Sequence, residues 1–89
     1  MIEKYIGKIL LIARDGCNGC RKAEEILRDK IDSGEVEVVK IDDPEGKRIA
    51  ELLRINYVPS FASVTKRGDK IKICRLDIFE EKVKECFEL

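Results

Sequence analysis

Cys17-Asn18-Gly19-Cys20 is the stretch that decides how the rest of the chain is interpreted. It follows an apolar run, Ile9–Ala13, and precedes apolar residues that recur at the spacing of one helix face. These residues are Ala23, Ile26, Leu27 and Ile31, and Cys20 extends their face one turn back. Cys17 therefore falls at a helix N-terminus, where unpaired backbone N–H groups and the helix dipole favour a thiolate. We expect Cys17 to be a nucleophile and Cys20, buried one turn further in, to be the resolving thiol.

Two cysteines at this spacing also occur in tetrahedral zinc sites, in structural disulfides and as ordinary buried thiols. The chain has four cysteines and no histidine. Eleven residues lie between Cys74 and Cys86, which form no second motif of this kind. The pattern therefore favours a redox-active Cys17–Cys20 dithiol over zinc binding or a structural role, and no metal site is expected.

Length and composition indicate one small domain covering residues 1–89. The 18 basic and 18 acidic residues balance to a net charge of zero, so neither nucleic acid nor an anionic membrane is indicated as a partner. The first residues lack a secretory pattern, and the longest apolar run is too short for a membrane span. We expect a monomer in the cytoplasm, where this motif is more often catalytic than structural.

The hydrophobic pattern predicts an α/β domain with the element order β-α-β-α-β-β-α. The expected strands cover residues 8–13, 35–41, 60–65 and 70–74, and the first is a central strand because it is apolar almost throughout. Gly34 ends the first helix, and Asp43 caps a second helix that begins at Pro44 and buries Ile49, Leu52 and Leu53.

The last third of the chain is expected to form a hairpin and then a helix. Residues 66–69 have the length and composition of a hairpin turn. Asp77 and Glu80 have the spacing of a capping box that begins a third helix. The apolar face of that helix is expected to consist of Phe79, Val83, Cys86 and Phe87. With Cys86 on this helix and Cys74 on a strand, we expect free thiols rather than a bridge between them.

Two motifs, Cys17-Asn18-Gly19-Cys20 and Val58-Pro59-Ser60-Phe61, occur in the order and spacing of the thioredoxin and glutaredoxin superfamily, and the chain resembles a small archaeal-type redoxin over essentially its whole length. The resemblance implies a thioredoxin-like fold with a four-stranded mixed sheet flanked by three helices. It also implies a cis proline at Pro59 beside the dithiol, with Val58 offering its backbone to the substrate.

The chain departs from both branches of that superfamily. Gly16 stands where thioredoxins have tryptophan, and Leu11 stands where they have a buried aspartate. Arg75-Leu76-Asp77 stands where glutaredoxins have the Gly-Gly used around glutathione, and Asp77 is expected to cap the last helix there. We therefore expect reduction of disulfide-containing proteins, with electrons from a thioredoxin-reductase-type flavoprotein or another dithiol donor and with no cofactor beyond the Cys17–Cys20 disulfide. The alternatives are a glutathione-dependent glutaredoxin and a non-catalytic thioredoxin-fold module for interaction or zinc binding.

Several neighbours of the dithiol are assigned supporting roles. Gly16 and Tyr57 are expected to line the substrate groove together with Val58 and Pro59. Three charged residues are expected to tune the pKa of Cys17, with the two arginines favouring the thiolate and the aspartate opposing it. These are Arg14, Asp15 and Arg21. Lys22 is interpreted as an ordinary solvated charge.

Overall fold

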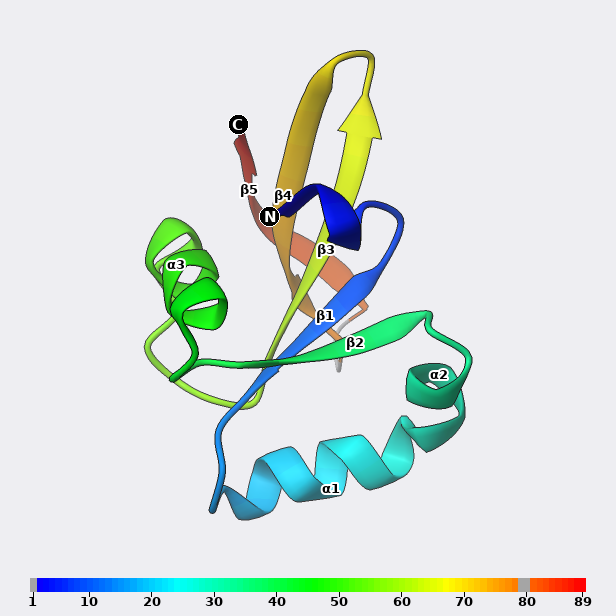
Figure 1. Cartoon of the computed structure of the whole chain (residues 1–89), viewed down its shortest axis with the longest axis vertical. Coiled ribbons are helices and arrows are strands. Elements are labelled where there is room, and N and C mark those ends of the chain that lie inside the picture. Colours follow the sequence, from blue (N-terminus) through cyan, green and yellow to red (C-terminus); the bar gives the residue numbers. More distant parts are fainter. Residues whose placement is uncertain (1, 79–80) are drawn as a thin grey trace.

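The structure, a computed structural model, describes residues 2–78 and 81–89 and contains one 3-10 helix, three α-helices and five strands within them (Figure 1). In chain order these elements are η1 (Ile2–Tyr5), β1 (Ile9–Ala13), α1 (Asn18–Ile26), α2 (Arg28–Asp32), β2 (Val36–Lys40), α3 (Pro44–Leu53), β3 (Ser60–Arg67), β4 (Lys70–Asp77) and β5 (Lys82–Glu88). The chain is therefore an α/β protein, as predicted.

The five strands form one mixed sheet in the order β2-β1-β3-β4-β5. β1 pairs parallel to β2 and antiparallel to β3, and the β3–β4 and β4–β5 pairs are both antiparallel. Four of the five β1 residues are buried, which confirms the prediction of a central strand. The predicted count of four strands is wrong, because β5 adds a fifth strand at the edge of the sheet.

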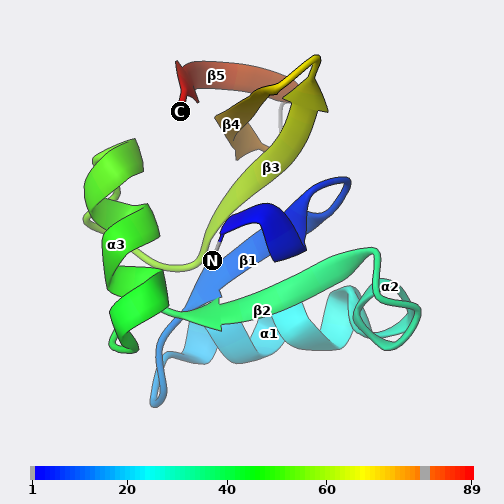
Figure 2. The same ribbon diagram turned by 45° about the horizontal axis from the view of Figure 1, so that its top comes forward.

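Helices lie on both faces of the sheet, as Figures 1 and 2 show. One face packs under α1 and α2, where Leu11, Ala13 and Phe61 of the sheet meet Cys20 of α1. The other face packs against α3 and η1. The buried cluster between this face and the helices consists of Tyr5, Leu10, Ile12, Val39, Ile49, Ala50, Leu53, Ile55, Ala62, Val64 and Ile73. The dithiol helix is thus fixed to the centre of the sheet by apolar contacts.

The first helix is shorter than its hydrophobic pattern suggests. It breaks at Leu27, whose backbone (φ −98°, ψ 15°) is not helical, and α2 starts at the next residue. Ile26 is consequently 76% exposed, so the prediction that it belongs to the buried face is wrong. Gly34 has a φ of +87° after the end of α2, which agrees with its predicted role as a helix stop.

The second predicted helix is confirmed as α3. Asp43 is its N-cap residue and Pro44 its first residue, while Ile49 and Leu53 are buried. Gly46 lets this helix approach β2 closely, since a Cβ atom there would lie 2.7 Å from the carbonyl carbon of Lys40. The close approach requires glycine at this position.

The predicted helix at the end of the chain is wrong. Residues 82–88 form β5, which pairs with β4, and Asp77 is the last residue of β4 rather than a helix cap. Phe79 and Glu80 of the expected helix lie outside the described residues. A helix in this segment would form its backbone hydrogen bonds within itself, whereas the strand forms them with β4. Local spacing does not reveal such a long-range pairing.

The prediction of free thiols at Cys74 and Cys86 is also wrong. The two residues lie directly opposite each other in the β4–β5 pairing, and they form a disulfide with a Cα–Cα distance of 4.0 Å. Strand pairing places both side chains on the same face of the sheet, which a helix carrying Cys86 would not have done. The chain therefore has two disulfides.

Candidate functional site

The loop after β1 delivers Cys17 to the start of α1. Cys17 is the N-cap residue, with extended backbone angles (φ −96°, ψ 112°), and its Sγ accepts a hydrogen bond from the backbone N–H of Cys20 at 3.1 Å. Cys17 is half-buried, while Cys20 is 1% exposed and packs beside Leu11. The predicted positions of both cysteines are confirmed. Helix N–H groups directed at Cys17 favour negative charge on its sulfur once the pair is reduced.

Cys17 and Cys20 are joined by a disulfide, with a Cα–Cα distance of 5.2 Å. This distance lies within the usual range for bridged cysteines. The surroundings of Cys20 are apolar, and they include the Leu11 side chain at the position where the resemblance would place an acid. Reduction of this bond gives one thiol at the helix start and one in the apolar core.

The Val58–Pro59 peptide bond is cis, as predicted, and it lies beside the dithiol turn. A Cβ atom on Gly19 would lie 3.3 Å from the Cδ of Pro59, so the middle of the Cys-x-x-Cys motif approaches the proline ring closely. The Ser60 hydroxyl donates a 2.6 Å hydrogen bond to the carbonyl oxygen of Tyr57, which closes the turn around Pro59. Two motifs forty residues apart in the sequence thus form one site.

A cavity of about 690 Å³ opens between α1, the Pro59 loop and the β4–β5 edge. Its apolar lining includes Ala23, Leu27, Val58, Pro59 and Leu76. Tyr57, which is 56% exposed, also lines it, so three of the four residues predicted to bind substrate border one space. Gly16 does not line this cavity. Its φ of +77° instead fits the turn between β1 and α1.

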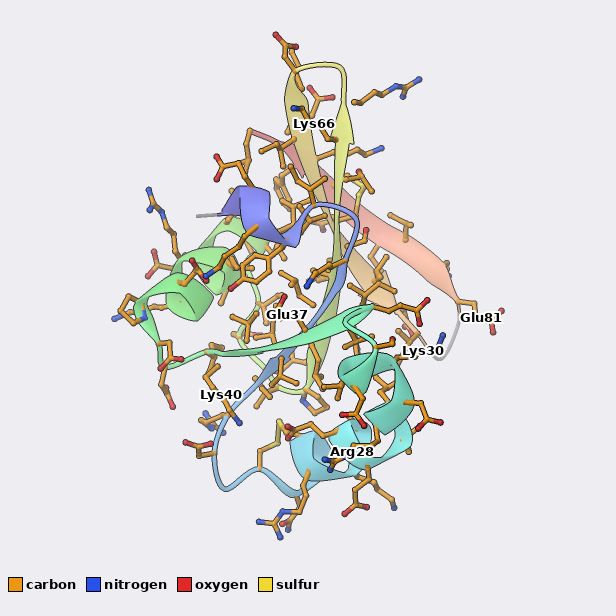
Figure 3. All side chains as sticks on the ribbon, turned by 45° about the vertical axis from the view of Figure 1, so that its right-hand side comes forward. Arg28, Lys30, Glu37, Lys40, Lys66 and Glu81 are labelled. Carbon is orange, nitrogen blue, oxygen red and sulfur yellow. A yellow bond between two sulfur atoms is a disulfide. The ribbon has the colours of Figure 1, made fainter. Side chains whose placement is uncertain are left out.

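The three charged residues predicted to tune Cys17 are all exposed. The carboxylate of Asp15 lies 3.1 Å from Nζ of Lys40, and Figure 3 shows Lys40 on β2 beside the loop that leads to α1. This ion pair offsets the negative charge of Asp15, and the effect of Asp15 on Cys17 stays a prediction. Because the Asp15 side chain is 92% exposed, water screens both effects. Arg14 and Arg21 lie on either side of the motif.

Sequence reasoning missed three cations on the cavity wall: Lys22, Arg75 and Lys84. Lys22 is exposed, as its prediction as solvated charge implies, and it also borders the cavity. Arg75 lies on β4, and Lys84 reaches the cavity from β5. The guanidinium of Arg75 lies 3.6 Å from Glu85. Its Nε–H is buried and has no hydrogen-bond partner in the part of the chain that the structure describes. Such an N–H group is a ready donor to a ligand oxygen.

No protein-family model, curated protein or solved structure matches this chain. Its class therefore rests on its own architecture: an α/β protein with a five-stranded mixed sheet and a Cys-x-x-Cys disulfide at a helix N-terminus. Within residues 2–78 and 81–89, no group of three or more metal-binding side chains is close enough to hold an ion. No helix in those ranges has the length and apolar character needed to cross a membrane.

Proposed function

We propose that this protein is a thiol–disulfide oxidoreductase with a thioredoxin-like fold, related to the small glutaredoxin-like redoxins. The observation that carries the proposal is the close approach of Gly19, in the Cys17–Cys20 turn, to the cis Pro59. A strand-capping proline at this point leaves the backbone of Val58 at the edge of the cavity, where an extended peptide is able to pair with it.

The reaction begins with the reduced protein. The Cys17 thiolate attacks one sulfur of a substrate disulfide, a Cys17–substrate bond forms, and the other substrate sulfur leaves as a thiolate that takes a proton. Cys20 then loses its proton to water and attacks the Cys17 sulfur, which releases the second substrate thiol and forms the Cys17–Cys20 disulfide. Two electrons and two protons pass to the substrate, and an external dithiol must reduce the protein again.

The surroundings of the two cysteines fit these different roles. Helix N–H groups favour a thiolate at the half-buried Cys17, whereas the apolar cluster around Cys20 favours a neutral thiol there. Because that cluster holds Leu11, the proton of Cys20 leaves without help from a carboxylate at this position. We expect the resolving step to be slower than the attack and to become faster as the pH rises.

The test is reduction of a disulfide-containing protein such as insulin by the wild-type chain, Cys17→Ser and Cys20→Ser, with dithiothreitol as donor. Cys17→Ser should lose all activity, because no thiolate remains at the helix start. Cys20→Ser should accumulate a mixed disulfide between Cys17 and the substrate, visible by mass spectrometry. Equal residual turnover in both variants, or no adduct on Cys20→Ser, would rule out the proposal and favour a structural role for the pair.

We propose a dithiol donor, a flavoprotein reductase or a small dithiol of the cytosol, as the source of electrons. The backbone at Arg75 and Asp77 pairs with β5. It therefore does not present the free helix N–H groups that would bind a carboxylate of glutathione. The sequence predicts a helix-capping Asp77 that disfavours glutathione. In the structure Asp77 pairs with β5 instead. Glutathione is the second candidate, since Arg75 and Lys22 place positive charge on the cavity wall. Saturable glutathione-dependent turnover that is lost in Arg75→Gln would favour it.

A further inference from the structure

The edge strand β5 has few apolar contacts to hold it. Phe87 is the one residue of the strand that is not exposed, and it packs against the cluster under α3. Side-chain ion pairs join it to β4, between Arg75 and Glu85 at 3.6 Å, between Lys84 and Asp77 at 3.7 Å, and between Lys70 and Glu88 at 4.0 Å. Ion pairs at the surface add little stability. The covalent bond between Cys74 and Cys86 is therefore the strongest single attachment of this strand to the sheet.

The two cysteines of that bond differ in exposure. Cys74 is 6% exposed, whereas Cys86 belongs to the exposed residues of β5. Thiol–disulfide exchange requires an attacking thiolate to approach one sulfur along the line of the S–S bond. Solvent reaches Cys86 and is largely excluded from Cys74. An external thiolate is therefore expected to attack Cys86, with Cys74 as the leaving group.

The bond lies next to the wall of the 690 Å³ cavity. On β4, Cys74 is followed directly by Arg75 and Leu76, which both line the cavity. On β5, Lys84 lines it from a position two residues before Cys86. The pairing of β4 with β5 is irregular between Arg75 and Leu76, so the ladder is locally interrupted beside the disulfide. The disulfide therefore joins the two strands that contribute Arg75, Leu76 and Lys84 to the cavity wall.

We infer that Cys74–Cys86 is a second thiol–disulfide exchange site, entered by external thiols at Cys86, which fastens β5 and the adjoining wall of the cavity. An external thiolate attacks the Cys86 sulfur, a mixed disulfide forms there, and Cys74 leaves as a thiolate that takes a proton. A second thiol then attacks the external sulfur of the mixed disulfide and releases the Cys86 thiol. In sum, two thiols are oxidised to one disulfide, and Cys74 and Cys86 are reduced.

The test uses the full chain carrying Cys17→Ser and Cys20→Ser, in which Cys74 and Cys86 are the remaining cysteines. The oxidised protein is exposed to 2-mercaptoethanol, quenched with acid and mapped by mass spectrometry. We expect the mixed disulfide on Cys86 in about tenfold excess over Cys74, because reactivity follows exposure. This variant lacks the proposed catalytic dithiol, so the result is independent of disulfide reductase activity.

Hydrogen exchange measured before and after full reduction reports on the strand itself. Amides of β5, including that of Lys84, should exchange about tenfold faster in the reduced form, while amides of β1 keep their rates. The matched control is Cys74→Ser with Cys86→Ser, which should show the fast β5 exchange with or without thiol. If the serine variants fail to fold, peptide mapping of the wild-type chain separates the two disulfides and gives the same comparison.

Four results would overturn the inference. They are free thiols at Cys74 and Cys86 in the oxidised protein, equal adducts on both cysteines, unchanged β5 exchange on reduction, and acceleration of β1 in parallel with β5. The last would show that the bond holds the whole domain rather than the edge strand.

Discussion

Gly19→Ala probes the contact on which the proposed function depends. The new Cβ atom would lie 3.3 Å from Cδ of Pro59 and 3.9 Å from its Cγ. The first distance is a few tenths of an ångström shorter than ordinary van der Waals contact, so the proline ring must move by that amount. Gly19 has a helical backbone rather than a positive φ, and alanine is therefore allowed at this position.

Two effects on stability oppose each other in this variant. Alanine favours a helical position over glycine by about 1 kcal/mol. The tight contact with the Pro59 ring costs a similar amount or less, since overpacking by a whole side chain costs about 1–3 kcal/mol. The free energy of unfolding should therefore change by less than about 1 kcal/mol. Activity should respond more strongly, because a misplacement of about 1 Å costs about 100-fold in rate.

For a shift of a few tenths of an ångström we expect kcat/KM for protein disulfide reduction to fall about 3- to 10-fold. The assay is insulin reduction with dithiothreitol, together with urea denaturation of each variant. Asn18→Ala, an exposed change in the same helical turn, is the matched control and should keep wild-type activity. Full activity in Gly19→Ala at unchanged stability would refute the view that the Gly19–Pro59 contact positions the site.

The other predictions concern stability. Gly46→Ala should lower the free energy of unfolding by about 2 kcal/mol in urea denaturation, because the clash with the Lys40 backbone outweighs the gain in helix propensity. Phe87→Ala should lower the free energy of unfolding by about 1–2 kcal/mol and loosen β5, while the helical signal in circular dichroism stays unchanged. Hydrogen bonding from the Tyr5 hydroxyl, then from Lys4, holds the pKa of Glu45 below its usual 4.5. That stabilisation is present above pH 4.5 and is lost as the pH falls through the lowered pKa. The Tm of Tyr5→Phe should therefore fall less between pH 5 and pH 3 than the Tm of the wild type.

The first two thirds of the fold followed from the sequence because local signals and tertiary contacts agree there. The apolar run at β1 requires burial on both faces, and it is paired on both sides. Asp43 and Pro44 mark the start of α3 by their own backbone preferences. The positions of Cys17 and Cys20 followed from helical spacing alone, since the face that buries Cys20 also carries Ala23 and Leu27.

The dithiol and Pro59 were expected to meet only through a family resemblance, because no local pattern joins two segments forty residues apart. Gly19 carries the physical reason for their contact, but a glycine in a motif does not reveal which neighbour approaches it. The cavity was harder still to foresee. Lys84 borders it from β5, so the role of Lys84 depended on an element that was assigned to the wrong class.

The end of the chain shows why that assignment failed. Residues 82–88 are rich in Lys and Glu, which favour helices, and Val83 and Phe87 have helical spacing. As a strand, the segment buries little beyond Phe87, so its hydrophobic pattern gives almost no strand signal. What opposes the helix is non-local: backbone pairing with β4 and the bond from Cys86 to Cys74. Because one of these two restraints is a reducible bond, reduction of Cys74 and Cys86 leaves backbone pairing alone to oppose the local preference for helix. An edge strand held in this way is the part of the domain that reduction should release first.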